Sequence, residues 1–236
     1  MNSKNPFKWR YYEKEIIFLN VRWSLRYPLS YRNLEEMMQE RGLSVDHSTI
    51  YRWVQHYTPE MKKRSRKYLR QSNDSYRIDE TYIKVRGKMK CLYRAIDSQG
   101  NTIDFLLRSR RNMRSAKSFL KKMLRAFHGS EPRVLSVDEN PAYPPAVKVL
   151  KEAKLLDKNC ILRQNKYWNN IIEQDHRFIK KLVRSGMGFK TFHSAWRTLK
   201  SYEIMNMIRK RPIKNIKKGE ILKQKQFIEN LFVHAA

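Results

Sequence analysis

The sequence contains little cysteine, few acidic residues and no long apolar run, and each scarcity excludes a class of protein. The two cysteines, Cys91 and Cys160, lie far apart and form no CxxC pair, so neither a disulfide framework nor a zinc site is expected. No apolar run approaches the roughly 20 residues of a membrane span. Residues 1–10 also lack the apolar core of a signal peptide. We therefore expect a cytoplasmic protein with no membrane partner.

The shortage of acidic residues points to the partner. Only 22 aspartates and glutamates stand against 51 lysines and arginines in 236 residues, for a formal charge of +29 and a pI near 10.3. Such a chain repels itself unless a polyanion is its usual partner. Basic residues recur along the whole chain among 13 tyrosines and 5 tryptophans, which favours nucleic acid. A merely basic globular protein is the plainer alternative.

Three helices are predicted between residues 11 and 57. Pro28 ends the first helix, Ser30 can cap the second, and a glycine turn precedes a third helix that begins near Asp46. Pro59 follows the third helix and predicts its end.

The third helix has an outer face that suits contact with DNA. Its apolar residues repeat at helical spacing and leave small polar and basic residues outward, namely His47, Ser48, Thr49, Tyr51, Arg52 and Gln55. Two short helices joined through a glycine turn match a helix-turn-helix, whose second helix enters the major groove. We take Ser48, Thr49, Tyr51 and Arg52 as candidate DNA contacts. The alternative is a plain three-helix bundle with a solvated outer face.

A basic segment at 61–75 separates a helix-turn-helix domain at 1–60 from a larger domain at 76–236. The segment could follow a DNA backbone or simply be a solvated helix face. The C-terminal tail of the larger domain is again rich in lysine and arginine.

Residues 76–236 combine strand and helix patterns. Alternating or short apolar runs predict five strands, at residues 76–85, 89–97, 102–107, 134–138 and 160–162. Helical patterns follow the third, fourth and fifth strands. Three strands, helix, strand, helix, strand, helix is the order of a ribonuclease-H-like domain. We predict an α/β fold class, with an N-terminal helix-turn-helix three-helix domain followed by a ribonuclease-H-like mixed-sheet catalytic domain.

Side chains at the ends of the first and fourth strands can meet in this order of elements. Asp138 ends the fourth strand, where open α/β sheets tend to place their sites. Within the first strand, Asp79 and Glu80 point to opposite faces, so we expect only one of them to join the site.

A third carboxylate begins a basic ridge on the last of these helices. At about 100° per residue, Glu173, Arg177, Lys180 and Arg184 share one arc, and apolar residues occupy the opposite side. Lys180 could hold a phosphate and Arg177 could contact DNA. Asp175 falls inside the apolar arc, and the pattern does not explain it.

Carboxylates on two strands and a helix suit magnesium. Hard oxygen ligands bind it, and two such ions about 3.5–4 Å apart can clamp the attacking and leaving oxygens of a phosphoryl displacement. Clustered acids hold protons, so metal binding should rise with pH. With 22 acidic residues, some triplet of this kind will always exist, so residue types alone make a weak case.

Three motifs resemble the DDE transposases of bacterial insertion sequences, most closely the family called insertion sequence six. They are Arg77-Ile78-Asp79-Glu80-Thr81, Val137-Asp138-Glu139-Asn140-Pro141 and Asn169-Asn170-Ile171-Ile172-Glu173. As in that family, 34 residues separate Asp138 from Glu173, and a basic residue, Lys180, lies seven positions after the glutamate. Segments around Ser30 and Ser48 also look like the family's DNA-binding region.

The resemblance implies a reaction and its site. Asp79, Asp138 and Glu173 would bind two Mg²⁺ ions, with Mn²⁺ as a substitute, and Lys180 would contact phosphate near the cleaved bond. The enzyme would bind terminal inverted repeats, cleave 3′ ends and transfer them to target DNA, with formation of a cointegrate. At least a homodimer would hold the two ends of double-stranded DNA. The rivals are a helix-turn-helix regulator without chemistry and a ribonuclease-H-like nuclease without strand transfer.

Overall fold

The structure is a computed structural model that describes residues 12–69, 71–126, 130–165, 170–185, 188–210, 213, 216–217 and 219–233. The chain forms two compact units. The first contains residues 1–69, 181–187 and 197–236, and the second contains 70–180 and 188–196. Helices α6 (Asn170–Ser185) and α7 (Phe192–Lys210) each contribute residues to both. The sequence division at 1–60, 61–75 and 76–236 stays a prediction.

The first unit begins with the three predicted helices, α1 (Lys14–Arg26), α2 (Tyr31–Gln39) and α3 (His47–Ser65). Ser30 caps α2 in a capping box with Asn33, and the Asp46 carboxylate accepts from the Ser48 N–H at 2.7 Å at the start of α3. Helix α8 (Ile221–Val233) belongs to the same unit, and its Phe232 ring lies 4.6 Å from that of Phe18. The three helices are confirmed, and their use as a helix-turn-helix stays a prediction.

The predicted end of α3 at Pro59 is wrong. The helix passes through the proline, continues to Ser65 and runs into a short 3-10 helix at Arg66–Tyr68. Proline removes a backbone donor and usually breaks a helix interior. Here Met61 and Ser65, on the far side of Pro59, are almost fully buried. Their packing keeps the segment helical, so the first part of the basic segment is helix.

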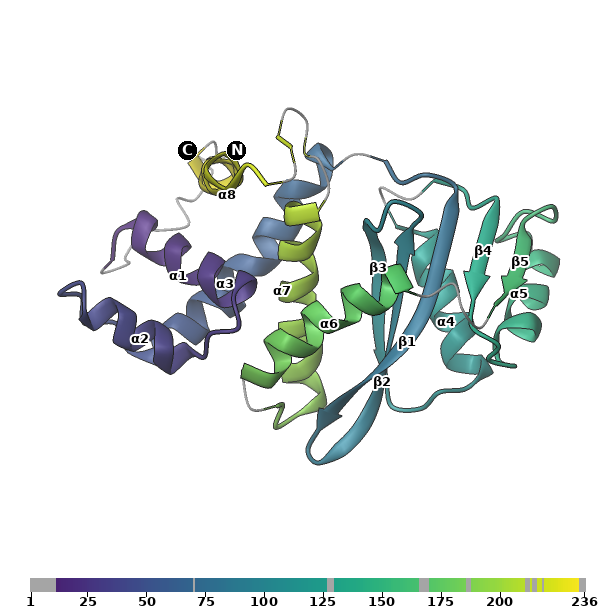
Figure 1. The fold of residues 1–236 in the computed structure, drawn as a ribbon, viewed down its shortest axis with the longest axis horizontal. Coiled ribbons are helices and arrows are strands. Elements are labelled where there is room, and N and C mark those ends of the chain that lie inside the picture. The colour runs from purple at the N-terminus through teal and green to yellow at the C-terminus, as the bar shows by residue number, and fades with distance from the viewer. Residues whose placement is uncertain are drawn as a thin grey trace. The chain divides into compact units, whose positions relative to one another are not determined.

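The second unit holds one five-stranded mixed sheet (Figure 1). Its strands are β1 (Ser75–Val85), β2 (Lys88–Asp97), β3 (Thr102–Arg108), β4 (Val134–Val137) and β5 (Ile161–Gln164). Their order in the sheet is β3-β2-β1-β4-β5. The first three pair antiparallel, and β4 and β5 run parallel to β1. This order confirms the predicted ribonuclease-H-like α/β class.

Helices cover both faces of this sheet. On one face, α4 (Met113–Leu124) and α5 (Tyr143–Glu152) close a core that includes Tyr76, Ile78 and Tyr93. Asn112 caps α4 by accepting from the Ser115 N–H at 2.9 Å. The first part of α6 lies over the other face (Figure 1). Side chains of β1 therefore alternate between two helical layers. Within the described residues, the helices are all too short or too polar to cross a membrane.

Candidate active site

The site forms where β1 and β4 part. The two strands pair only from Ser75 to Arg77 on β1, so among the described residues no strand pairs with residues 78–84 on that side. Asp138 follows directly after the last residue of β4. Carboxylate oxygens of Asp79, Glu80 and Asp138 there lie within 4.8 Å of one another.

The expectation that only one of Asp79 and Glu80 joins the site is wrong, because both belong to this group. Their Cβ atoms do leave opposite faces of the strand. However, β1 lacks a paired strand at this point, so side chains from both faces can bend around its open edge toward Asp138. The alternation rule holds for the strand but does not limit side chains at an unpaired edge.

Glu80 is the most firmly held of the three carboxylates. Its Oε1 accepts from the Tyr143 hydroxyl and from the Asn140 amide, each at 2.9 Å, and its Oε2 accepts from Arg111 at 3.2 Å. Its side chain is 1% exposed. Glu80 thus joins β1 to the start of α5 and to the segment before α4.

Arg111 also bonds Asp138, with Nη2 2.7 Å from Oδ2. The backbone N–H of Asn140 donates to the other oxygen of Asp138 at 3.3 Å. Sequence reasoning missed Arg111, because it stands in a basic run from Arg108 and no spacing separates it from the 51 lysines and arginines. Only the fold shows that this arginine faces the carboxylates.

Burial and like charge act together on these acids. Burial raises the pKa of Glu80, and the negative charge of Asp138 raises it further. Burial also raises the pKa of Asp138, although the Arg111 guanidinium opposes the shift. A bound divalent cation would offset the like charge and favour the ionised form of both groups.

Asp79 faces the other helical layer, where its Oδ2 lies 3.3 Å from Nε2 of His176 on α6. His176 is buried, and its Nδ1 has no hydrogen-bond partner within the described residues. The neighbouring Asp175 forms an ion pair with Arg94 of β2 at 2.5 Å, and both side chains are fully buried. This pair explains the acid in the apolar arc of the helix.

The basic ridge of α6 is confirmed as a solvent-facing arc. Glu173 lies in the first turn of α6, and Glu173, Arg177, Lys180 and Arg184 are all exposed. On the opposite side Ile172, Ile179 and Leu182 are buried. Glu173 does not belong to the group of clustered oxygens within the described residues. Asn169, at the start of the third motif, lies outside the described residues.

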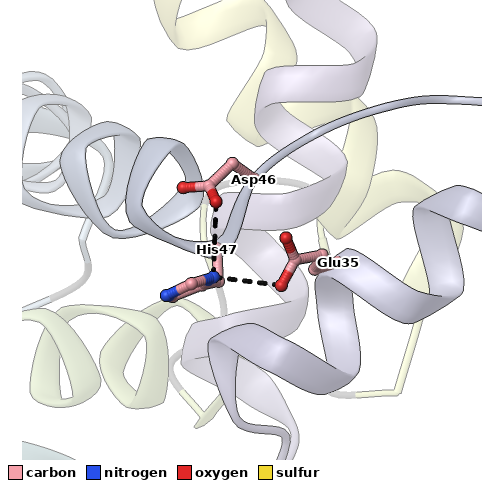
Figure 2. A group of neighbouring side chains, drawn as sticks. All are labelled: Glu35, Asp46 and His47. Atoms are coloured by element: carbon pink, nitrogen blue, oxygen red, sulfur yellow. Dashed lines mark hydrogen bonds and ion pairs between the residues drawn. The ribbon is translucent and has the colours of Figure 1, made fainter.

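A second group of possible metal ligands lies in the first unit (Figure 2). His47 Nδ1 lies 3.0 Å from Glu35 of α2 and 3.5 Å from Asp46. The candidate DNA contacts follow on the same helix. Ser48 and Thr49 are half-buried and Tyr51 and Arg52 are exposed, and the ring of Tyr51 meets Tyr31 edge-on at 5.7 Å.

Comparisons with known proteins agree with this arrangement. A family model described as a DDE domain matches residues 73–212. The transposase for the insertion sequence-like element IS431mec of Staphylococcus aureus (strain Mu50) is 41% identical over 209 residues, which cover 88% of this chain and 90% of that protein. The chain belongs to the insertion-sequence-six family of DDE transposases. The transposase is therefore an enzyme of DNA cleavage and transfer.

Another transposase and two solved structures also show similarity to this chain. The transposase for IS257 in transposon Tn4003, also from Staphylococcus aureus, shows the same identity and coverage. Among solved structures, the catalytic core domain of BIV integrase gives a TM-score of 0.41 at 12% identity and covers 66% of this chain and 98% of that chain. The HTLV-2 integrase catalytic core in complex with magnesium gives 0.37 at 16% identity, over 48% of this chain and 71% of that chain.

The carboxylates of the transposase suit a divalent metal ion. Asp79, within β1, and Asp138, directly after the adjacent β4, offer hard oxygen ligands close together. Burial raises the pKa of Asp138, and the nearby Asp79 carboxylate adds to the shift, so a bound cation would favour the ionised form. Glu80 fits less well as a ligand, because Tyr143, Asn140 and Arg111 already occupy its two oxygens.

A basic pocket of about 530 Å³ opens beside the segment that carries Arg111. It is lined by the N-terminal part of α4 and the residues before it, together with one aromatic side chain, namely Arg108, Ser109, Arg110, Asn112, Arg114, Ser115, Ser118 and Phe192. Its lining combines three guanidinium groups and no acid. Such a surface suits the phosphates of a polyanion.

Proposed function

We propose that the transposase binds the terminal inverted repeats of its element, cleaves their 3′ ends with water and transfers the freed ends to target DNA. The observation that carries the proposal is the meeting of Asp79 and Asp138, on adjacent strands, within a basic unit. The relatives that match over most of the chain are named as transposases of insertion sequences. We further propose that the reaction is replicative and forms a cointegrate.

In this proposal Asp79 and Asp138 hold the metal, and Glu173 completes the second ion's site when DNA is bound. Two divalent ions, Mg²⁺ or in its place Mn²⁺, would supply charge that activates the attacking oxygen and stabilises the leaving one. Arg177 and Lys180 point outward from the same arc of α6 as Glu173 and would bind phosphates that flank the cleaved bond. Glu80 and Arg111 keep the Asp138 segment in place.

The N-terminal helices would recognise the repeats. In a helix-turn-helix, α3 would enter the major groove, and Ser48, Thr49, Tyr51 and Arg52 would meet bases or phosphates. The three-part division at 1–60, 61–75 and 76–236 would then separate DNA reading from catalysis. A homodimer or larger oligomer would hold two ends together, in the cytoplasm of a bacterium.

A strand-transfer assay tests the proposal. Purified transposase is mixed with a labelled duplex of the terminal repeat, supercoiled plasmid and magnesium, beside Asp138→Asn. The proposal expects joined plasmid from the wild type and none from the variant. Nicks without joining would instead indicate a ribonuclease-H-like nuclease, and bound but unbroken DNA would indicate a helix-turn-helix regulator.

The salt dependence of the affinity for DNA gives an independent check of the proposed electrostatic interface. With a charge of +29, affinity for the repeat duplex should fall steeply between low and moderate salt. Affinity that stays flat over that range would contradict a phosphate-based interface.

A further inference from the structure

Asp79 and Arg94 form a cross-strand pair on one face of the sheet. They stand directly opposite each other in the antiparallel register of β1 and β2. Directly opposed residues project to the same face with their Cβ atoms about 4.5–5.5 Å apart. The pair thus presents one carboxylate and one guanidinium, side by side, to the helix on that face.

Two consecutive residues of α6 contact the two members of this pair. Asp175 bonds Arg94 at 2.5 Å, and His176 lies 3.3 Å from the Asp79 carboxylate. All four side chains are mostly or fully shielded from water, with Asp79 the most exposed at 15%. We call Asp79, Arg94, Asp175 and His176 the α6 clamp.

The clamp fixes the rotation of α6 about its own axis. Consecutive helical residues are about 100° apart, so a turn of the helix by one position would break both contacts at once. Because the contacts reach two different strands, a slide of the helix along either strand would also break one of them. Glu173 lies two positions before Asp175, so its direction follows from the rotation that the clamp sets.

Stability alone does not account for a buried ion pair at this place. Burying two charges has a large desolvation cost, and apolar residues of similar volume often do as well or better. A paired charge constrains the rotation of α6 through a directional contact, whereas an apolar pair constrains it through packing alone. The pair therefore provides direction that an apolar contact would not.

We propose that Arg94, Asp175 and His176 are positioning residues, which hold α6 at one rotation. Glu173, exposed in this structure, then keeps the direction from which it can complete the site of Asp79 and Asp138 when DNA is bound. This inference rests on the role given to Glu173 under the proposed function. In this inference His176 also orients the Asp79 carboxylate directly.

The first experiment replaces the ion pair by apolar residues of similar size, Arg94→Met with Asp175→Leu. The matched control is Lys122→Met with Asp104→Leu, which removes another ion pair between a strand and a helix of the same unit, away from α6. Binding of Mn²⁺ to the full chain is measured by titration with electron paramagnetic resonance detection, beside Glu173→Gln and the wild type.

The clamp predicts that the Arg94/Asp175 variant loses Mn²⁺ affinity by about 10–100-fold, as Glu173→Gln does, while the control pair keeps wild-type affinity. The melting temperature of the variant should stay within about 4 °C of the wild type. Wild-type Mn²⁺ binding by this variant, beside a weakened Glu173→Gln, would overturn the clamp and leave the proposed function intact.

Hydrogen exchange separates the clamp from the role of Glu173. If Glu173→Gln binds Mn²⁺ normally, the metal role of Glu173 fails. The clamp is then judged by amides of residues 172–178, which should exchange at least about 10-fold faster in the Arg94/Asp175 variant than in the control pair. Unchanged exchange there would refute the clamp by itself.

A second pair of variants covers the case in which the double substitution does not fold. His176→Leu removes the contact to Asp79, whereas His176→Gln keeps a donor of similar reach. The clamp expects His176→Leu to weaken Mn²⁺ binding and His176→Gln to restore most of it. Equal binding by both variants would show that the contact has no positioning role.

Discussion

Two groups of side chains in this protein each bring three possible metal ligands within 4.8 Å, yet their surroundings differ. Asp79, Glu80 and Asp138 are all acids, and burial raises the pKa of the last two. In the other group, His47 stands between Glu35 and Asp46, and the three side chains are 26–55% exposed. Closeness of ligands is therefore the same in both groups, but charge and hydration are not.

The difference indicates which group is built for a cation. Like charges that are brought together away from water favour any added positive charge, which is the condition for metal binding. In the second group the histidine already serves as partner to both acids, and Asp46 is occupied in capping α3. We interpret that group as a link between α2 and α3 of the predicted helix-turn-helix.

The largest expected effect follows from removing the Asp79 carboxylate, and removal of the Glu35 carboxylate in the second group is the comparison. Asp79→Asn should lower Mn²⁺ affinity by more than about 100-fold, beyond the 10–100-fold that loss of an outer partner costs. Glu35→Gln should leave Mn²⁺ affinity unchanged, because His47 and Asp46 already satisfy each other. Titration of both variants checks the comparison, and equal losses would mean that the two groups are not distinguished by their charge.

A smaller effect should follow from Glu80→Gln, which keeps the shape of the side chain but removes its charge. We expect Mn²⁺ affinity to fall by about 10–100-fold, since Arg111 and Asn140 would no longer hold the Asp138 segment as firmly. Tyr143→Phe is the matched control, because it removes one hydrogen bond to Glu80 and leaves the charge. A larger loss in Tyr143→Phe than in Glu80→Gln would argue against the charge of Glu80.

The pH dependence should have opposite signs for stability and for metal binding. Because burial holds the pKa of Glu80 and Asp138 above the ordinary carboxyl value of about 4, the folded chain retains protons there that the unfolded chain has lost. Without metal, stability should fall as pH rises through that window, while Mn²⁺ affinity should rise. Melting curves and titrations at several pH values test both signs, and affinity independent of pH would contradict the electrostatic argument.

The smallest effect is expected in the second group. His47→Gln should lower the free energy of unfolding by less than about 1 kcal/mol, which is the usual contribution of an exposed ion pair. Affinity for the terminal repeat should fall a few-fold, because α2 would hold α3 less firmly. Denaturation curves and binding to the repeat duplex are the measurements. A loss of Mn²⁺ binding in this variant would show that the group does hold a metal.

Local patterns predicted those parts of the fold that neighbouring residues decide. Ser30 and Asp46 begin their helices as expected, and the basic arc of α6 follows from its helical period. The end of α3 at Pro59 was wrong, because packing of Met61 and Ser65 outweighs the missing backbone donor. Asp175 had no local explanation, since its partner Arg94 lies 81 residues away.

The sequence by itself determined the family, the order of strands and helices, and the basic character of the surface, because motif spacing and hydrophobic period are written along the chain. Only the tertiary structure decided that Glu80 joins Asp79 and Asp138, that Arg111 faces them, and that Arg94 forms an ion pair with Asp175. These contacts depend on where β1 loses its neighbouring strand and on which buried charges find a partner. Neither property is visible in the spacing of residues along one chain.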